Sequence, residues 1–230
     1  MIQLVVDSTA AVPKDFLEQH ANVHVIPLFI SVKIIVICIT SGVSGTYNGA
    51  VLAARQSGRK QIAVINSRTT AVGMMEVLED GLDMIEKGLS FEEISKGLQE
   101  SASLMRTTFT VPTLDYLRRG GRVGKAAGLI GSILKIKPVI FLNDNNEVDV
   151  LAKVRTEKKA AAAMLDYLHK NSPCRRIGIV HIENEEGGRA LQKRIQEEYP
   201  DIQVTLSTGT PVLASYLGPG LTGIIFESAK

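Results

Sequence analysis

The segment Ser44-Gly45-Thr46-Tyr47 has the residue types of an anion-binding loop. It follows the apolar run Ile34 to Ile39 and precedes a segment compatible with a helix. Glycine lets a backbone approach a ligand closely, hydroxyl groups donate hydrogen bonds, and the free N–H groups at a helix start favour a negative group. The pattern predicts a strand-to-helix junction that binds an anion, and a capped turn without a ligand is the alternative.

A second candidate for anion binding is a turn rich in arginine. Arg118, Arg119 and Arg122 surround the pair Gly120-Gly121. Because a guanidinium group forms paired hydrogen bonds with carboxylates and phosphates, this turn is a plausible anion clamp. Ordinary solvated surface charge is the alternative.

The sequence lacks the usual catalytic and metal-binding patterns. Its four histidines are scattered without the spacing of a metal-binding pair, and Ser44 is not part of a Gly-x-Ser-x-Gly elbow. Cys38 and Cys174 also lack metal-ligand spacing and have the character of reduced thiols. We therefore predict no catalytic residue and no metal ligand.

Composition argues against several classes of partner. The 230 residues include 26 Lys+Arg and 24 Asp+Glu, for a net charge of +2, and no Trp. Such balanced charge with few aromatic residues is untypical of nucleic-acid binding. The first residues lack the pattern of a signal peptide, and polar residues and Pro27 interrupt the apolar stretch Val23 to Ile39. We expect a cytoplasmic protein that does not span a membrane.

Alternating strands and helices predict an α/β fold with two domains. In the first half, strands are predicted at Ile2–Val6, Val23–Ile30, Ile34–Ile39 and Gln61–Ile65, with helices at Lys14–His20 and after Thr46. This order implies a parallel sheet, in an N-terminal domain of residues 1–105. From Thr107 the pattern changes, which indicates a C-terminal mixed α/β domain of residues 106–230.

Local signals locate further elements. Val72, Met75, Leu78, Leu82 and Ile85 recur at helical spacing, and we expect this stripe to lie in the core. A capping box of Ser90 and Glu93 predicts the start of the next helix. Strands at Pro138–Leu142 and Glu147–Leu151 flank the polar segment Asn143–Asn146, which predicts a hairpin.

One junction does not fit this scheme. Only Ser31-Val32-Lys33 separates the second predicted strand from the third. Parallel neighbours need a crossover of roughly a dozen residues, and these three residues lack the chemistry of a tight hairpin turn. We hypothesise that a segment is missing between about Ile30 and Ile34.

Five motifs in one order relate the chain to a known family. They are Asp7-Ser8-Thr9-Ala10, Ser44-Gly45-Thr46-Tyr47, Leu117 to Val123 around the Gly-Gly turn, Arg155 with Lys158-Lys159-Ala160, and Gly218-Pro219-Gly220. With them the chain resembles the DegV family over nearly its whole length. The resemblance implies a two-domain α/β protein that binds one long-chain fatty acid in a tunnel, with the carboxylate at the domain interface.

The resemblance further implies a carrier that is not itself an enzyme. Family members serve as the fatty-acid-binding subunit of bacterial fatty acid kinase. Such a carrier presents the carboxylate of a palmitate-, stearate- or oleate-type acid to a separate kinase subunit. Acyl phosphate then passes to enzymes of phospholipid synthesis, and transient membrane contact is compatible with this role. Neither a cofactor nor nucleic acid is implied. The alternative is an enzyme that acts on a small sugar or phosphorylated anion at the Ser-Gly-Thr loop.

The residues implied for the lipid site come from three of these motifs and from the position just before the Gly-Pro-Gly loop. They are Ser8, Thr9, Ser44, Gly45, Thr46, Arg122 and Tyr216. Ser44 and the N–H groups near Gly45 and Thr46 would hold the carboxylate, because burying this charge without donors is prohibitive. Arg122 would neutralise the carboxylate or the acyl phosphate.

The chain departs from the family pattern at three places. It has no counterpart of the Thr-Ser-Gln-Pro-Ser segment, whose threonine also holds the carboxylate in family members. Ala11 replaces an aspartate, and Tyr216 stands where many members have histidine. A phenol still donates a hydrogen bond, but it does not become charged near neutral pH.

Overall fold

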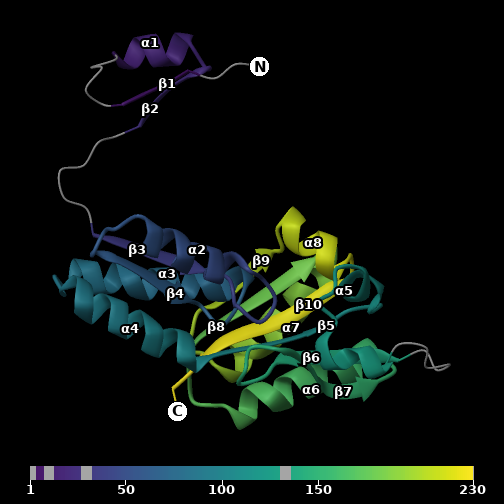
Figure 1. Ribbon diagram of the computed structural model, residues 1–230. Coiled ribbons are helices and arrows are strands. Elements are labelled where there is room, and N and C mark those ends of the chain that lie inside the picture. Colours follow the sequence, from purple (N-terminus) through teal and green to yellow (C-terminus); the bar gives the residue numbers. More distant parts are fainter. Residues whose placement is uncertain (1–3, 8–12, 27–32, 130–135, 230) are drawn as a thin grey trace. The chain divides into compact units, whose positions relative to one another are not determined.

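The computed structural model describes residues 4–7, 13–26, 33–129 and 136–229. The chain divides into two compact units, Met1–Ile34 and Ile35–Lys230 (Figure 1). In the small unit, β1 (Leu4–Asp7) and β2 (Val23–Ile26) pair in parallel, and α1 (Lys14–Gln19) connects them. This pairing confirms the parallel arrangement that the strand–helix–strand order predicts. The proposed missing segment borders residues 27–32, which lie outside the described residues, so that hypothesis stays a prediction.

The larger unit begins with a two-stranded sheet and continues into a six-stranded one. From β3 onward the elements are β3 (Ile34–Cys38), α2 (Thr46–Gln56), β4 (Ile62–Asn66), α3 (Ala71–Glu86), α4 (Phe91–Leu104), β5 (Met105–Thr110), α5 (Asp115–Arg119), the 3-10 helix η2 (Gly124–Leu129), β6 (Lys137–Leu142), β7 (Val148–Val154), α6 (Glu157–Lys170), β8 (Cys174–Ile182), α7 (Glu185–Glu198), β9 (Val204–Thr208), α8 (Pro211–Leu217) and β10 (Leu221–Ser228). Strands β3 and β4 pair with each other, and α2 and α4 pack against β4.

The six-stranded sheet has the order β7-β6-β5-β10-β8-β9. All its pairs are antiparallel except β8 with β9, so the sheet is mixed, as the sequence predicts. Strands β6 and β7 form the predicted hairpin around residues 143–146. Asn146 takes a left-handed φ of 64° in that loop, a conformation that asparagine tolerates.

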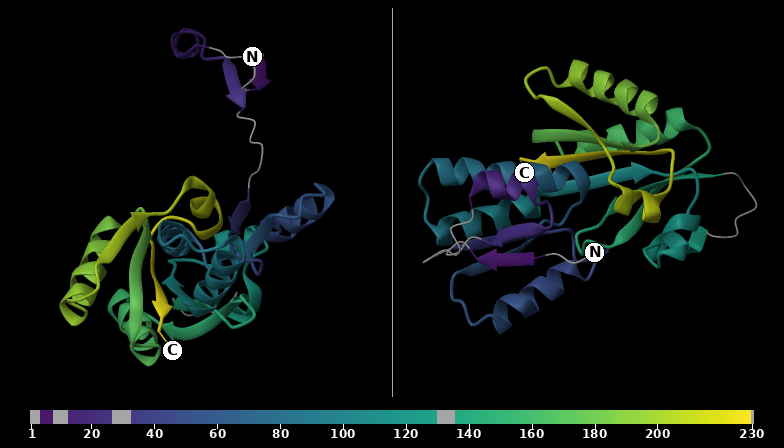
Figure 2. Two further views of the ribbon diagram at one scale, coloured as in Figure 1. Left: turned by 90° about the vertical axis from the view of Figure 1, so that its left-hand side faces the viewer. Right: turned by 90° about the horizontal axis from the view of Figure 1, so that it is seen from above.

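Helices cover both faces of this sheet (Figure 2). Consecutive residues of β10 point in opposite directions, so Ile224 joins the core beneath α6 and α7, and Ile225 joins the core on the side of α3 and α4. The predicted capping box is also confirmed, because Ser90 and Glu93 form it completely at the start of α4. In the described ranges, no helix is both long and apolar enough to cross a lipid bilayer.

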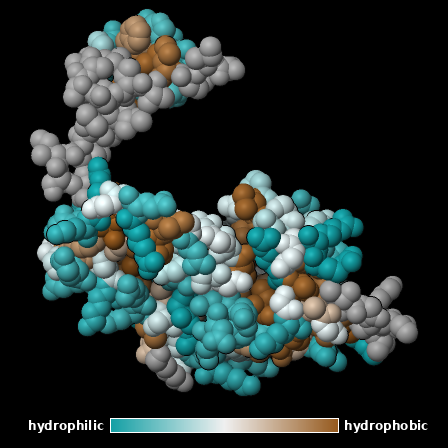
Figure 3. Space-filling model, viewed as in Figure 1, coloured by the Kyte–Doolittle hydropathy of each residue, from teal (hydrophilic) through white to brown (hydrophobic). Residues whose placement is uncertain are grey.

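Helix α3 corrects one prediction about the core. The helix forms where the apolar spacing predicts it, and Val72 is buried. Met75, Leu78, Leu82 and Ile85, however, are between 45% and 58% exposed, so the expectation that this stripe lies in the core is wrong. Figure 3 shows that hydrophobic residues reach the surface of the larger unit at several places on a mostly hydrophilic face.

The buried side of α3 carries charge instead. Glu76 and Asp80 are about 95% buried against the sheet, close to Glu227 of β10. Arg176 donates to Asp80 at 2.9 Å, and Arg175 donates to Glu227 at 2.9 Å. Burial raises the pKa of Glu76 to about 8, although the nearby Arg176 guanidinium opposes this change. Burial also raises the pKa of Glu227.

Candidate functional site

A cavity of about 260 Å³ lies on the α3 side of the six-stranded sheet. Most of its lining is apolar, and the apolar side chains come mainly from the six-stranded sheet and from α5 and α8. Prominent among them are Phe109, Leu117, Leu142, Val180, Leu213 and Ile225. Such a lining suits the hydrocarbon part of a ligand.

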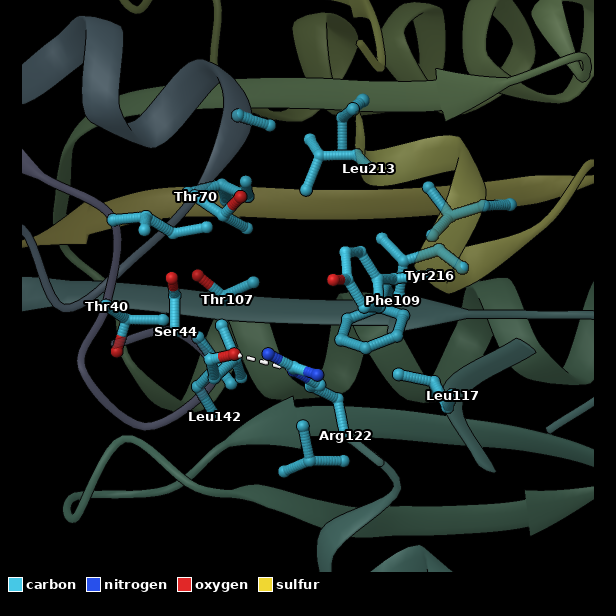
Figure 4. A pocket seen from close by; sticks show the side chains of 18 of the residues that line it. Thr40, Ser44, Thr70, Thr107, Phe109, Leu117, Arg122, Leu142, Leu213 and Tyr216 are labelled. Atoms are coloured by element: carbon cyan, nitrogen blue, oxygen red, sulfur yellow. Dashed lines mark hydrogen bonds between the residues drawn. The ribbon is translucent and has the colours of Figure 1, made fainter. Parts of the chain in front are cut away.

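Hydroxyl groups gather at one end of the cavity. Thr40, Ser44, Thr70 and Thr107 line this end, and they come from three separate parts of the chain. Figure 4 shows them on one side of the cavity, with Phe109, Leu117 and Tyr216 on the other side and Arg122 between the two groups. The cavity therefore has one end with hydrogen-bonding groups and one end without a comparable cluster, as an amphiphilic ligand requires.

The loop after β3 positions Ser44. The start of this loop is hydrogen-bonded to the end of β4 and the loop that follows it. The Thr40 N–H donates to the Thr69 carbonyl at 3.0 Å, and the Asn66 amide donates to the Ser41 hydroxyl at 2.8 Å. The Ser44 hydroxyl lies 2.8 Å from the Thr46 hydroxyl and accepts from the Thr46 N–H at 3.3 Å. These bonds hold Ser44 just before the first turn of α2.

Glycines in this loop have different structural roles. A Cβ atom on Gly42 would lie 1.7 Å from the carbonyl oxygen of Asn146, so only glycine allows the loop to pass this close to the β6–β7 hairpin. A Cβ atom on Gly45 would meet nothing within 4 Å. Close packing against the hairpin therefore explains Gly42, whereas no such contact constrains Gly45, which is the N-cap of α2.

Arg122 connects the two predicted anion-binding motifs. Its Nε donates to the carbonyl of Val43 at 3.1 Å, and its Nη1 donates to the carbonyl of Gly120. Its guanidinium carbon also lies 4.9 Å from the centre of the Tyr216 ring, which is a cation–π contact with α8. Arg122 thus joins the loop after β3, the turn after α5 and helix α8 at the wall of the cavity.

The structure brings together four of the seven predicted site residues. Ser44, Thr46, Arg122 and Tyr216 line this one cavity, whereas Gly45 is not among its lining residues. Ser8 and Thr9 lie outside the described residues. The contribution of each of the seven to ligand binding stays a prediction.

Sequence reasoning missed the threonines of the hydroxyl end. Thr40 comes two residues after β3 and Thr70 comes four residues after β4. The carboxyl ends of strands are where α/β sheets commonly bind ligands, so strand-end position was the available signal. Thr40 is completely buried, and its hydroxyl has no hydrogen-bond partner among the described residues.

Comparison with known proteins places the chain among relatives that bind lipids. A fatty acid-binding protein of Thermotoga maritima is 32% identical over 200 residues, which cover 84% of this chain and 68% of that protein. The solved structure of the fatty acid kinase (Fak) B3 protein of Streptococcus pneumoniae, loaded with linoleic acid, matches with a TM-score of 0.75. That match has 26% identity and covers 85% of this chain and 72% of the other.

Two further matches concern the family itself. Protein DegV of Bacillus subtilis is 26% identical over 276 aligned positions, which cover 97% of this chain and 98% of that protein. Because 276 positions exceed the 230 residues of this chain, that relative contains residues without a counterpart here. The family model described as "Uncharacterised protein, DegV family" matches residues 31–229. With this match over most of its length, the chain belongs to the DegV family.

Proposed function

We propose that the protein binds one long-chain fatty acid in the cavity described above. The observation that carries this proposal is the division of the cavity into an apolar part and an end rich in hydroxyl groups. Each methylene group transferred from water to an apolar lining contributes about 0.8 kcal/mol, so a palmitate-, stearate- or oleate-type chain gains most of its affinity there. A sugar or a small phosphorylated anion gains nothing comparable from Phe109, Leu117 or Ile225.

The carboxylate of the fatty acid would lie near Ser44. A buried carboxylate needs several hydrogen-bond donors, and the Ser44 hydroxyl with the N–H groups at the start of α2 supplies them. Arg122 carries the compensating positive charge, since its guanidinium group lines the same cavity and keeps donors that Val43 and Gly120 do not occupy.

The proposed domain division agrees with this placement. We propose domains of residues 1–105 and 106–230, with the fatty acid between them. Thr40, Ser44 and Thr70 precede the proposed boundary, whereas Thr107, Arg122 and Tyr216 follow it, and all six line the cavity.

The biological role proposed for the bound fatty acid is that of a carried substrate. The protein would present the carboxylate to a separate kinase subunit, which forms the acyl phosphate, and enzymes of phospholipid synthesis would consume it after transient contact at a membrane. The likeness to a fatty acid kinase B3 protein supports this role. No catalytic group of the carrier itself takes part in this scheme.

A titration of delipidated protein tests the binding step. We expect palmitate and oleate to bind with one site per chain, and a sugar phosphate of similar charge to produce no signal. Binding of the sugar phosphate without binding of either fatty acid would favour the alternative of a small-anion enzyme.

A further inference from the structure

Thr70 occupies the N-cap position of α3 but does not cap the helix. At the starts of α4, α6, α7 and α8, the N-cap side chain accepts a backbone N–H of its own helix, and these caps are Ser90, Thr156, Asn184 and Thr210. The Thr70 side chain accepts no such bond. A threonine at this position normally stabilises its helix through that bond, so its hydroxyl is available for another role.

The Thr70 hydroxyl belongs to the hydroxyl end of the cavity. Figure 4 shows Thr70 on the same side of the cavity as Ser44 and Thr107. The Ser44 hydroxyl is bonded to Thr46, and the Thr107 hydroxyl lies 2.9 Å from that of Thr69. Thr70 has no such side-chain partner within the described ranges, so its hydroxyl remains open to a ligand.

A second observation concerns a neighbouring hydroxyl at this end of the cavity. The hydroxyl of Thr40, a completely buried neighbour in the lining, also lacks a partner among the described residues. A buried hydroxyl without a hydrogen bond is unfavourable, so a group that pairs with it stabilises the protein. Thr70 and Ala71 also bring the start of the 16-residue helix α3 to the cavity, where the first N–H groups and the helix dipole favour negative charge.

We propose that Thr70 donates a hydrogen bond to the carboxylate of the bound fatty acid at the start of α3. Ser44 and Thr70 would then hold the head group from two different loops, one after each strand of the β3–β4 sheet. This inference rests on the proposed fatty acid binding. It adds a specificity-determining contact, because a hydroxyl donor and a helix start distinguish a carboxylate from its ester.

The test measures the affinity of Thr70→Val, Thr70→Ser and the unaltered protein for palmitate and for methyl palmitate. We expect delipidated Thr70→Val to bind palmitate about 10- to 100-fold more weakly than the unaltered protein. Methyl palmitate, which carries no charge, should bind both proteins with similar affinity. Thr70→Ser keeps the hydroxyl and should bind palmitate within about threefold of the original value.

Thr156→Val provides a matched control, because Thr156 caps α6 with its hydroxyl and does not line the cavity. Loss of the Thr156 cap should lower the melting temperature by about 2–4 °C without changing palmitate affinity. Thr70→Val, in contrast, should leave the melting temperature of the ligand-free protein unchanged. Equal weakening of palmitate and methyl palmitate, together with a lower melting temperature, would show a purely structural role for Thr70 and overturn the inference.

Two other outcomes separate the inference from the function on which it rests. If the unaltered protein binds palmitate and Thr70→Val binds it equally well, fatty acid binding stands and the role of Thr70 is refuted. If the unaltered protein binds neither palmitate nor its ester, the proposed function fails and the inference fails with it.

Discussion

Ser44 is the side chain on which we expect head-group binding to depend most. Replacing it with alanine removes one hydrogen bond to a charged group, which typically contributes about 1.5 to 3 kcal/mol. We therefore expect Ser44→Ala to weaken palmitate binding by that amount in a calorimetric titration. Ser57→Ala serves as the control, because the Ser57 hydroxyl lies at the exposed far end of α2, where it donates to the Ala54 carbonyl and accepts from the Arg59 N–H. Equal affinity of Ser44→Ala and Ser57→Ala would remove Ser44 from the site.

Glu76 gives the folded state a specific dependence on pH. Its pKa is about 8 in the folded protein and 4.5 for the ordinary side chain, so between these values the folded state binds a proton that the unfolded state releases. Stability therefore falls as pH rises through this window, by up to about 1.4 kcal/mol per pH unit from this group. Arg176, Glu79, Asp80 and Glu227 face the same carboxyl group and modulate its charge.

Glu76→Gln, which resembles the protonated side chain, should remove this dependence. We expect the variant to unfold at higher urea concentration than the original protein at pH 8, and at a similar concentration at pH 4.5 to 5. Glu86→Gln, at an exposed position on the same helix, serves as the control variant. A Glu76→Gln profile parallel to that of the original protein would show that Glu76 titrates normally.

Among the elements, the loop between β3 and α2 keeps its conformation by packing closely against the β6–β7 hairpin. Gly42→Ala forces a methyl group into the backbone of Asn146, and overpacking of this kind typically costs about 1 to 3 kcal/mol. The methyl group of Gly45→Ala would contact nothing within 4 Å, and the φ of −75° suits alanine. The stability of the folded protein should therefore stay equal or rise slightly. Urea unfolding and palmitate titration of both variants check this expectation. A well-folded Gly42→Ala protein with normal affinity would contradict it.

Some of these elements and site residues could be predicted from the sequence, and others could not. The strand-to-helix junction at Ser44 and the turn at Arg122 were predictable, because glycine, hydroxyl and arginine residues form compact motifs there. Periodicity located α3 but gave the wrong face, since its buried side carries Glu76 and Asp80, and the arginine that pairs with Asp80 lies far away in the sequence. Thr40 and Thr70 were missed because a threonine near a strand end has many ordinary roles, and only the folded chain shows which hydroxyl lacks a partner.

For the whole molecule, we propose a carrier that acts with a second protein. Arg122 should matter most after the carboxylate has become an acyl phosphate, because a doubly charged head group interacts more strongly with a guanidinium group. We expect Arg122→Ala to reduce acyl phosphate formation by a fatty acid kinase subunit more than it reduces palmitate affinity. Equal losses in the two assays would make Arg122 an ordinary carboxylate ligand.

The most direct test of fatty acid binding is the mass of the protein as it is purified. Native mass spectrometry followed by organic extraction should reveal one fatty acid per chain, lost on denaturation, and should identify its length and unsaturation. A protein that emerges without lipid, and that also fails to take up added palmitate or oleate, would contradict the central claim.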